Sequence, residues 1–187
     1  MPAPGGPPSR PRPQRPHRGL ENLVQASARF TRAHLVFMGW GPLLADLQGL
    51  AARVGVSDRV AFIDPVPMSA LLDMTAGADL GVIPYRNAGL NNFYTSPNKL
   101  FEYCAAGVPV VASAFPELKK VVEGLQVGRT FDPDDPDAIA AAVNALLEDP
   151  AELARVRLNA SRAAGEFTWE SEVRALVDAY AALPVDG

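Results

Sequence analysis

The chain has 187 residues, of which 48% are hydrophobic and 20% are charged, and its formal net charge is −4. This composition is typical of one soluble globular domain, and the acidic balance gives no indication of a nucleic-acid partner. No apolar run approaches the ~18 residues of a transmembrane helix, and the first residues lack the apolar stretch of a secretory signal, so we expect a cytoplasmic protein, either free or peripheral to the inner face of the membrane.

Residues 1–17 are expected to form a separate arm. The first 18 residues hold seven of the 18 prolines and four arginines without any acid, which gives them a charge of +4 and leaves −8 for the remainder. Proline lacks an N–H donor and fixes φ, so this stretch cannot be a central strand. We expect a disordered or polyproline arm that stability does not require, with docking of its two P-x-x-P segments to a partner as the alternative.

Residues 18–187 are predicted to form one α/β domain. Helical periodicity or capping predicts helices over 19–31, 43–54, 68–76, 97–106 and 116–124 and three more after residue 135. Short apolar runs predict buried strands at 34–38, 59–63, 79–84, 109–113 and 128–131. Such alternation indicates a doubly wound parallel sheet with helices on both faces.

Helix ends are indicated by residue type. Ser96 is a candidate N-cap, with Pro97 at the first helical position. Gly107 is expected to end this helix in the left-handed conformation. Asp135 and Thr168 are candidate N-caps of later helices.

Two segments at strand ends are candidate ligand sites, because ligands of open parallel sheets bind at the carboxyl ends of the strands. One contains Gly39 and Gly41, directly after a strand. In the other, the amides of Asn98 and Lys99 and the Lys99 ammonium are suited to phosphate, and Glu102, one turn further on, is suited to ribose hydroxyls. The alternative is a surface pair between Lys99 and Glu102, worth ~0.3 kcal/mol.

The remaining reactive residue types indicate no further chemistry. Cys104, the single cysteine, is expected to be an inert buried residue. The two histidines are isolated, and His34 is expected to lie in the core. We therefore predict no metal and no cofactor.

The segment Ser96-Pro-Asn-Lys-Leu-Phe-Glu-Tyr-Cys-Ala-Ala-Gly-Val-Pro-Val-Val-Ala112 resembles the helix and strand typical of retaining family 4 glycosyltransferases. Segments 18–21, 34–42 and 78–85 resemble the same family in the same order, from about residue 18 to the end of the chain. The resemblance implies the carboxyl-terminal half of a GT-B fold, a Rossmann-like domain that binds a nucleotide-diphosphate sugar. The family's acceptor domain, with its catalytic histidine, has no counterpart in the chain.

The resemblance also implies roles for individual residues. Glu102 matches the second glutamate of a Glu-x7-Glu motif, which contacts the ribose, whereas Tyr94 stands where the first glutamate belongs. Arg18 matches the second of two basic residues near the diphosphate, and Pro13 stands in the place of the first. With the helix dipole, Lys99 and Arg18 are expected to stabilise the leaving diphosphate.

The resemblance begins one element late, because a domain of this type starts with a strand that leads into the helix at 19–31, and the proline-rich arm stands in its place. In the order 3-2-1-4-5-6, this first strand is central. We therefore expect the sheet to be split or completed by another chain, and we expect the chain alone to be inactive. A separate chain that carries the acceptor domain is a candidate partner. The sequence leaves two alternatives open. One is a non-catalytic nucleotide-binding or interaction module, and the other is a nucleotide-sugar epimerase of the same architecture.

Overall fold

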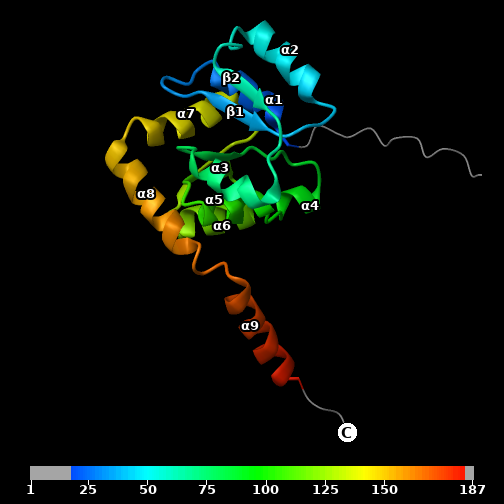
Figure 1. The fold of residues 1–187 in the computed structure, drawn as a ribbon, viewed down its shortest axis with the longest axis vertical. Helices are drawn as coiled ribbons and strands as arrows, with labels where there is room; N and C mark the ends of the chain where they lie inside the picture. The colour runs from blue at the N-terminus through cyan, green and yellow to red at the C-terminus, as the bar shows by residue number, and fades with distance from the viewer. Residues whose placement is uncertain (1–17, 184–187) are drawn as a thin grey trace, which may run out of the picture.

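The computed structural model describes residues 18–183, so the arm predicted at residues 1–17 lies outside the described residues. Helices and strands alternate in the predicted order (Figure 1). The described strands are β1 (Leu35–Met38), β2 (Val60–Ile63), β3 (Gly81–Ile83), β4 (Val110–Ser113) and β5 (Gly128–Phe131). The described helices are α1 (Leu20–Ser27), α2 (Leu44–Val54), η1 (Met68–Ala70, a 3-10 turn), α3 (Leu71–Ala76), α4 (Leu90–Phe93), α5 (Asn98–Ala105), α6 (Pro116–Gly124), α7 (Pro136–Leu147), α8 (Pro150–Ala163) and α9 (Trp169–Ala181).

The described strands form two parallel sheets instead of one. β1 pairs with β2, with Leu35 opposite Val60. In the second sheet β4 lies between β3 and β5. The predicted α/β class is confirmed, and so is the expectation of a split sheet within the described residues. In the doubly wound order, the two sheets occupy the positions on either side of the central strand.

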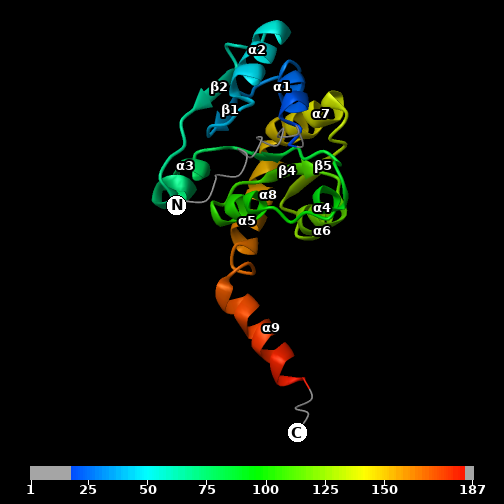
Figure 2. The same ribbon diagram turned by 90° about the vertical axis from the view of Figure 1, so that its right-hand side faces the viewer.

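One hydrophobic core joins the two sheets. It contains Leu35 of β1 and Val60 of β2 together with Val111 of β4 and Phe131 of β5. Helices α1 and α7 contribute their apolar faces to this core and pack against each other (Figures 1 and 2). Each fully buried Val or Leu side chain contributes about 1.5–3 kcal/mol, so this shared core holds the sheets together as one domain.

Strand β4 separates this core from a second one. Val111 belongs to the first core, whereas Val110 and Ala112 belong to the second, which helices α5, α6 and α8 cover. The division follows from the strand geometry, because successive side chains point to opposite faces. All four residues of β4 are buried, as expected for a strand with both faces covered.

Some helix ends follow the sequence and one does not. Asp135 caps α7 as predicted, and its Oδ1 accepts a hydrogen bond from the Asp137 amide at 2.8 Å. Gly107 adopts the expected left-handed conformation, with φ of 66°. The prediction for Ser96 is wrong: Pro97 is the N-cap of α5, and no side chain caps the helix. Pro97 is extended, with ψ of 146°, so the helix begins one residue later than expected.

Two other boundaries differ from the prediction. The helix expected over 19–31 ends at Ser27, because the amides of Arg29 and Phe30 bond to carbonyls three residues back and close a tighter turn. Between the strand predicted at 79–84 and the helix predicted over 97–106, where no element was predicted, lies the single turn of α4.

His34 is exposed, so the core position expected for it is wrong. Strand β1 begins only at Leu35, and His34 therefore precedes the paired part of the strand.

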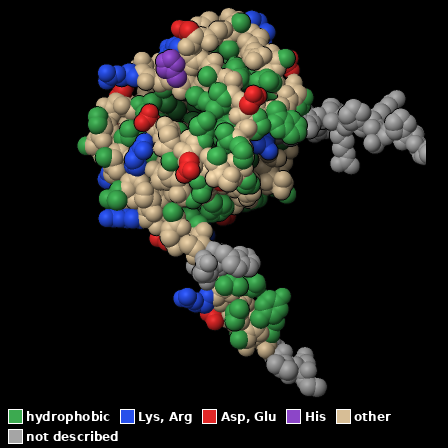
Figure 3. Space-filling view, viewed as in Figure 1, with side chains coloured by type: hydrophobic (Ala, Val, Ile, Leu, Met, Phe, Trp, Pro, Cys, Tyr) green, Lys and Arg blue, Asp and Glu red, His purple; other side chains and the backbone are tan. Residues whose placement is uncertain are grey.

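Helix α9 projects away from both sheets (Figures 1 and 2). Leu176, Val177 and Tyr180 on this helix are 51%, 59% and 68% exposed, and hydrophobic side chains gather along it in Figure 3. Within residues 18–183, neither α9 nor any other helix is long and apolar enough to cross a membrane.

Cys104 should be protected from thiol reagents in the folded protein. It is fully buried, and burial raises the pKa of its thiol to about 11, so little thiolate forms at mildly alkaline pH. Ellman's reagent should therefore label Cys104 only after the chain is unfolded in guanidinium chloride. Rapid labelling of the native protein would contradict the buried, inert position.

Candidate functional site

The loops at the carboxyl ends of the strands are linked to one another. Because both sheets are parallel, these loops and the starts of the following helices lie at the same edge of each sheet. Arg86, in the loop after β3, forms an ion pair of 2.6 Å with Asp134, in the loop after β5. Asn22 of α1 donates through Nδ2 to the carbonyl of Pro133 at 2.8 Å. These contacts connect α1 with the loops after β3 and β5.

Helix α1 begins against the backbone of the loop after β3. Gly19, its N-cap, has a left-handed φ of 62°. A Cβ at this position would lie 1.8 Å from the carbonyl oxygen of Pro84, so only glycine allows the close approach. The contact places the neighbouring Arg18 beside the same loop.

Arg18 lies over the ring of Tyr85. Its Cζ is 5.8 Å from the ring centroid, which is within the range of a cation–π interaction. The Tyr85 carbonyl accepts a hydrogen bond from the hydroxyl of Ser113 at 2.7 Å, and that hydroxyl is also 3.1 Å from the Ile83 carbonyl. Ser113 is fully buried at the end of β4.

Arg18 was predicted from the sequence, whereas Tyr85 and Ser113 were missed. Two signals pointed to them: a tyrosine placed directly after a strand, and a serine that ends an otherwise apolar buried strand. Neither signal identifies the residue that Tyr85 or Ser113 contacts, because Arg18, Tyr85 and Ser113 are far apart in the sequence.

A pocket of about 370 Å³ lies at the carboxyl end of β1. It is lined by three predicted site residues, Arg18, Gly39 and Gly41. The two glycines have φ of 138° and 158°, which side chains with a Cβ rarely adopt. The rings of Phe37 and Phe62, stacked with centroids 5.3 Å apart, line the same pocket.

The start of α5 carries the residues predicted to contact phosphate and ribose. Lys99 Nζ lies 2.6 Å from Glu102 Oε2, and the two side chains are 44% and 23% exposed. The surface pair considered as the alternative is therefore formed. The amides of Asn98 and Lys99 are the first two of the helix and have no partner inside it. Ser96 is exposed just before this helix.

Tyr94 lies directly after α4 and is 57% exposed. Its ring meets Phe93 edge-on at 5.0 Å, and Phe93 in turn packs against Phe115 at 5.4 Å. Residues 80–101 contain no acidic side chain. The departure from the Glu-x7-Glu pattern at Tyr94 is thus not offset by a neighbouring carboxylate in the sequence.

The eight predicted site residues therefore fall into two places. Three of them line the pocket beside β1. The other five do not line that pocket and lie at or just before the start of α5; they are Tyr94, Ser96, Asn98, Lys99 and Glu102.

The loop after β5 contains an Asp-x-Asp spacing, Asp132-Pro-Asp134, which the prediction of no metal wrongly took to be absent from the sequence. Asp132 Oδ1 accepts a hydrogen bond from the Asp134 amide at 2.9 Å, and Asp134 pairs with Arg86. Both carboxylates thus have protein partners. Among the described residues, no three His, Cys, Asp or Glu side chains are grouped as metal ligands.

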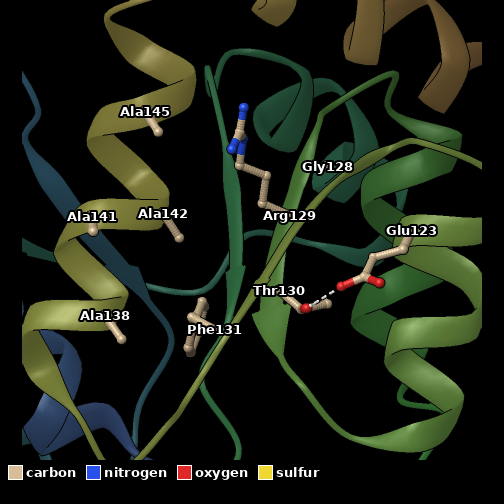
Figure 4. A pocket seen from close by; sticks show the side chains of 9 residues that line it. All are labelled: Glu123, Gly128, Arg129, Thr130, Phe131, Ala138, Ala141, Ala142 and Ala145. Carbon is tan, nitrogen blue, oxygen red and sulfur yellow. Dashed lines mark hydrogen bonds between the residues drawn. The ribbon is translucent and has the colours of Figure 1, made fainter.

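A larger cavity, of about 540 Å³, lies between β5 and α7 (Figure 4). Residues 128–131 form one wall, and alanines of α7 form the other. The hydroxyl of Thr130 donates to the carboxylate of Glu123 inside it. None of the predicted site residues lines this cavity.

The sequence matches a family model described as "Glycosyl transferases group 1" over residues 11–149, which is more than half of the chain. The chain belongs to this family.

Two curated relatives show how much of this group 1 glycosyltransferase chain, and how much of each relative, the match covers. A D-inositol 3-phosphate glycosyltransferase of Xylanimonas cellulosilytica is 32% identical over 169 residues, which cover 88% of the chain and 39% of the relative. A GDP-mannose-dependent alpha-(1-6)-phosphatidylinositol monomannoside mannosyltransferase of Mycolicibacterium smegmatis is 33% identical over 140 residues, which cover 72% of the chain and 37% of the relative. The chain thus spans about two fifths of the length of these relatives.

Solved structures confirm the fold of this group 1 chain. Sucrose-phosphate synthase of Thermosynechococcus elongatus superposes with a TM-score of 0.72 and 27% identity, and covers 88% of this chain and 42% of the synthase. Anabaena Alr3699/HepE, solved with UDP and glucose, superposes with a TM-score of 0.76 and 20% identity, and covers 90% of this chain and 46% of HepE. The chain therefore has the fold of a Rossmann-like half of a GT-B glycosyltransferase, as predicted.

The extent of the family match differs slightly from the expected one. The resemblance was predicted to run from about residue 18 to the end of the chain. The family model begins at residue 11, inside the segment assigned to the arm, and ends at residue 149, before α8.

In this group 1 chain, Gly19→Ala should destabilise the fold more than Gly55→Ala. Both glycines are left-handed, with φ of 62° and 77°, and this conformation costs alanine about 1–2 kcal/mol. A Cβ at Gly55 would meet open space, whereas one at Gly19 would clash with Pro84, which adds roughly 1–3 kcal/mol. Urea unfolding of both variants measures the difference, and equal losses would contradict the close contact with Pro84.

Proposed function

We propose that this chain is the donor-binding half of a glycosyltransferase and that it holds a nucleotide-diphosphate sugar at the carboxyl edge of its sheets. The observation that carries the proposal is the start of α5, where Lys99 and Glu102 lie one turn apart and in contact. A helix N-terminus beside an ammonium favours phosphate, and a carboxylate one turn further on suits ribose hydroxyls. Family membership makes a nucleotide-sugar donor the natural ligand of this arrangement.

The names of relatives support the class of ligand. The Mycolicibacterium relative is named as GDP-mannose-dependent, and HepE was solved with UDP and with UDP-glucose. These ligands share a nucleoside diphosphate, whereas their bases and sugars differ. The proposal therefore specifies a diphosphate donor and leaves base and sugar open.

The contact between Lys99 and Glu102 is compatible with donor binding. Both side chains are partly exposed, and an exposed pair of this kind is worth less than about 1 kcal/mol. An ammonium has three N–H donors, so Lys99 keeps Glu102 as a partner while it donates to a phosphate oxygen. The proposal requires the pair to leave the Glu102 carboxylate free to accept from the ribose hydroxyls, one turn beyond the phosphate donors.

Arg18 supplies a second cation in the proposal. Negative charge collects on the diphosphate as the bond to the sugar breaks, and cations fixed beside it lower the barrier. Lys99, Arg18 and the dipole of α5 provide this stabilisation, so the proposal requires no metal ion. The backbone at Gly39 and Gly41 and the side chains of Tyr94, Ser96 and Asn98 complete the proposed donor contacts.

Replacement of Glu102 by Ala should weaken nucleoside diphosphate binding by ~1–3 kcal/mol, the range for lost charge-assisted hydrogen bonds. Titration calorimetry with UDP and with GDP measures this loss. Glu152→Ala is a matched control, because Glu152 is also 23% exposed and also pairs with a basic residue three positions away, Arg155. The control should bind like the parent, and equal affinities for all three proteins would exclude the ribose role of Glu102.

The purified 187-residue chain should bind the donor without transferring sugar. Transfer requires donor and acceptor to be held together, which accounts for ~7–11 kcal/mol of the barrier, and the chain spans about two fifths of its relatives. We propose that the acceptor is held by a further domain, which completes the cleft. By itself, the chain then acts as a binding module, which is the non-catalytic alternative that the sequence left open.

The test is incubation of the purified chain with UDP- and GDP-sugars and with lipid or sugar acceptors. We expect no glycosylated product. A product that follows the protein through purification and disappears in Glu102→Ala would overturn this expectation. Slow donor hydrolysis would agree with it, because hydrolysis requires no bound acceptor.

A further inference from the structure

Three consecutive residues after β3 are each held by a different part of the fold. The Pro84 carbonyl lies against the start of α1. The Tyr85 carbonyl accepts a hydrogen bond of 2.7 Å from Ser113 at the end of β4. The Arg86 guanidinium pairs with the loop after β5 at 2.6 Å. Anchors on three sides fix the backbone from which the Tyr85 side chain projects.

The guanidinium of Arg18 lies over the ring of Tyr85. Its Cζ lies 5.8 Å from the ring centroid, and none of the ion pairs among the described residues involves Arg18. A long, exposed arginine side chain samples many rotamers unless a neighbour restricts it. Arginine also stacks on aromatic faces while its N–H groups remain free to donate in the plane of the guanidinium.

We propose that Tyr85 is a positioning residue: Ser113 holds its backbone carbonyl, and its ring holds the Arg18 guanidinium ready for the diphosphate of the donor. This inference rests on the proposed donor-binding function and adds a residue and a role to it. The ring lowers the entropy that Arg18 loses when the anion binds, and it leaves the N–H groups of the guanidinium available. Tyr85 itself need not touch the ligand.

The contribution of the ring is separable from that of the hydroxyl. Tyr85→Phe keeps the aromatic face, so the guanidinium stays in place, whereas Tyr85→Leu removes it. A direct hydrogen bond from the tyrosine hydroxyl to the sugar or phosphate predicts a loss in both variants, because neither Phe nor Leu has a hydroxyl. Tyr180→Leu is a control for the same substitution outside the candidate site, because Tyr180 is 68% exposed on the projecting helix α9.

The first experiment is titration calorimetry of the full chain with UDP, GDP and the nucleosides uridine and guanosine. Tyr85→Leu should weaken diphosphate binding about two- to fivefold, the factor that corresponds to an exposed cation–π contact, and leave nucleoside binding unchanged. Tyr85→Phe and Tyr180→Leu should bind like the parent. A loss that is equal for nucleosides and diphosphates would overturn the proposal, because Arg18 has no anion to meet in a nucleoside.

A double-mutant cycle tests whether Tyr85 acts through Arg18. In the Arg18→Ala background, Tyr85→Leu should have no further effect on UDP or GDP binding. The same two- to fivefold loss in both backgrounds would show that Tyr85 acts independently of Arg18, and would overturn the proposal. Ser113→Ala should reproduce part of the Tyr85→Leu loss only while Arg18 is present.

A ligand-free measurement distinguishes failure of this inference from failure of the proposed function. Ring currents of Tyr85 should shift the side-chain NMR signals of Arg18 upfield in the parent and in Tyr85→Phe, but not in Tyr85→Leu. Shifted Arg18 signals without binding of UDP or GDP would overturn the donor-binding function, and the positioning role with it. Diphosphate binding that depends on Arg18 but is insensitive to Tyr85→Leu would overturn the positioning role alone.

Discussion

The packing of α1 and α7 over both sheets is the interaction on which the rest of this fold depends. The sheets share no backbone hydrogen bonds among the described residues, so the core formed by Leu35, Val60, Val111 and Phe131 must join them. Burial of each such apolar side chain is worth about 1.5–3 kcal/mol, and several act together. This core also fixes the start of α1 relative to the ends of β3 and β5.

The candidate site follows from that placement. The start of α1 meets the Pro84 backbone and brings Arg18 over the Tyr85 ring, while α5 presents Lys99 and Glu102 at its own start. The chain as a whole is acidic, with a net charge of −4, so these cations are a local arrangement and not a consequence of composition. The family of group 1 glycosyl transferases gives this arrangement its chemical context, and the match covers about two fifths of the Xylanimonas relative.

Local signals predicted most of the elements and part of the site. The strands were found because each is a short apolar run, and the Asp135 cap and the Gly107 terminus were found because residue type decides them. Ser96 was misjudged as a cap because its role depends on ψ of Pro97, which packing sets. His34 was misjudged because a residue one position before the paired strand faces solvent even though its neighbours are apolar.

The sequence by itself determined the alternation of helices and parallel strands, the order of the strands and the glycines of the site, because periodicity and backbone conformation are local properties. It also placed Lys99 and Glu102 one turn apart, which helix geometry fixes. Only the tertiary structure decided which distant residues meet. Tyr85 and Ser113 come together across 28 positions, and Arg18, at the start of the domain, meets Tyr85, because the shared core, and not any local pattern, brings their loops to one edge.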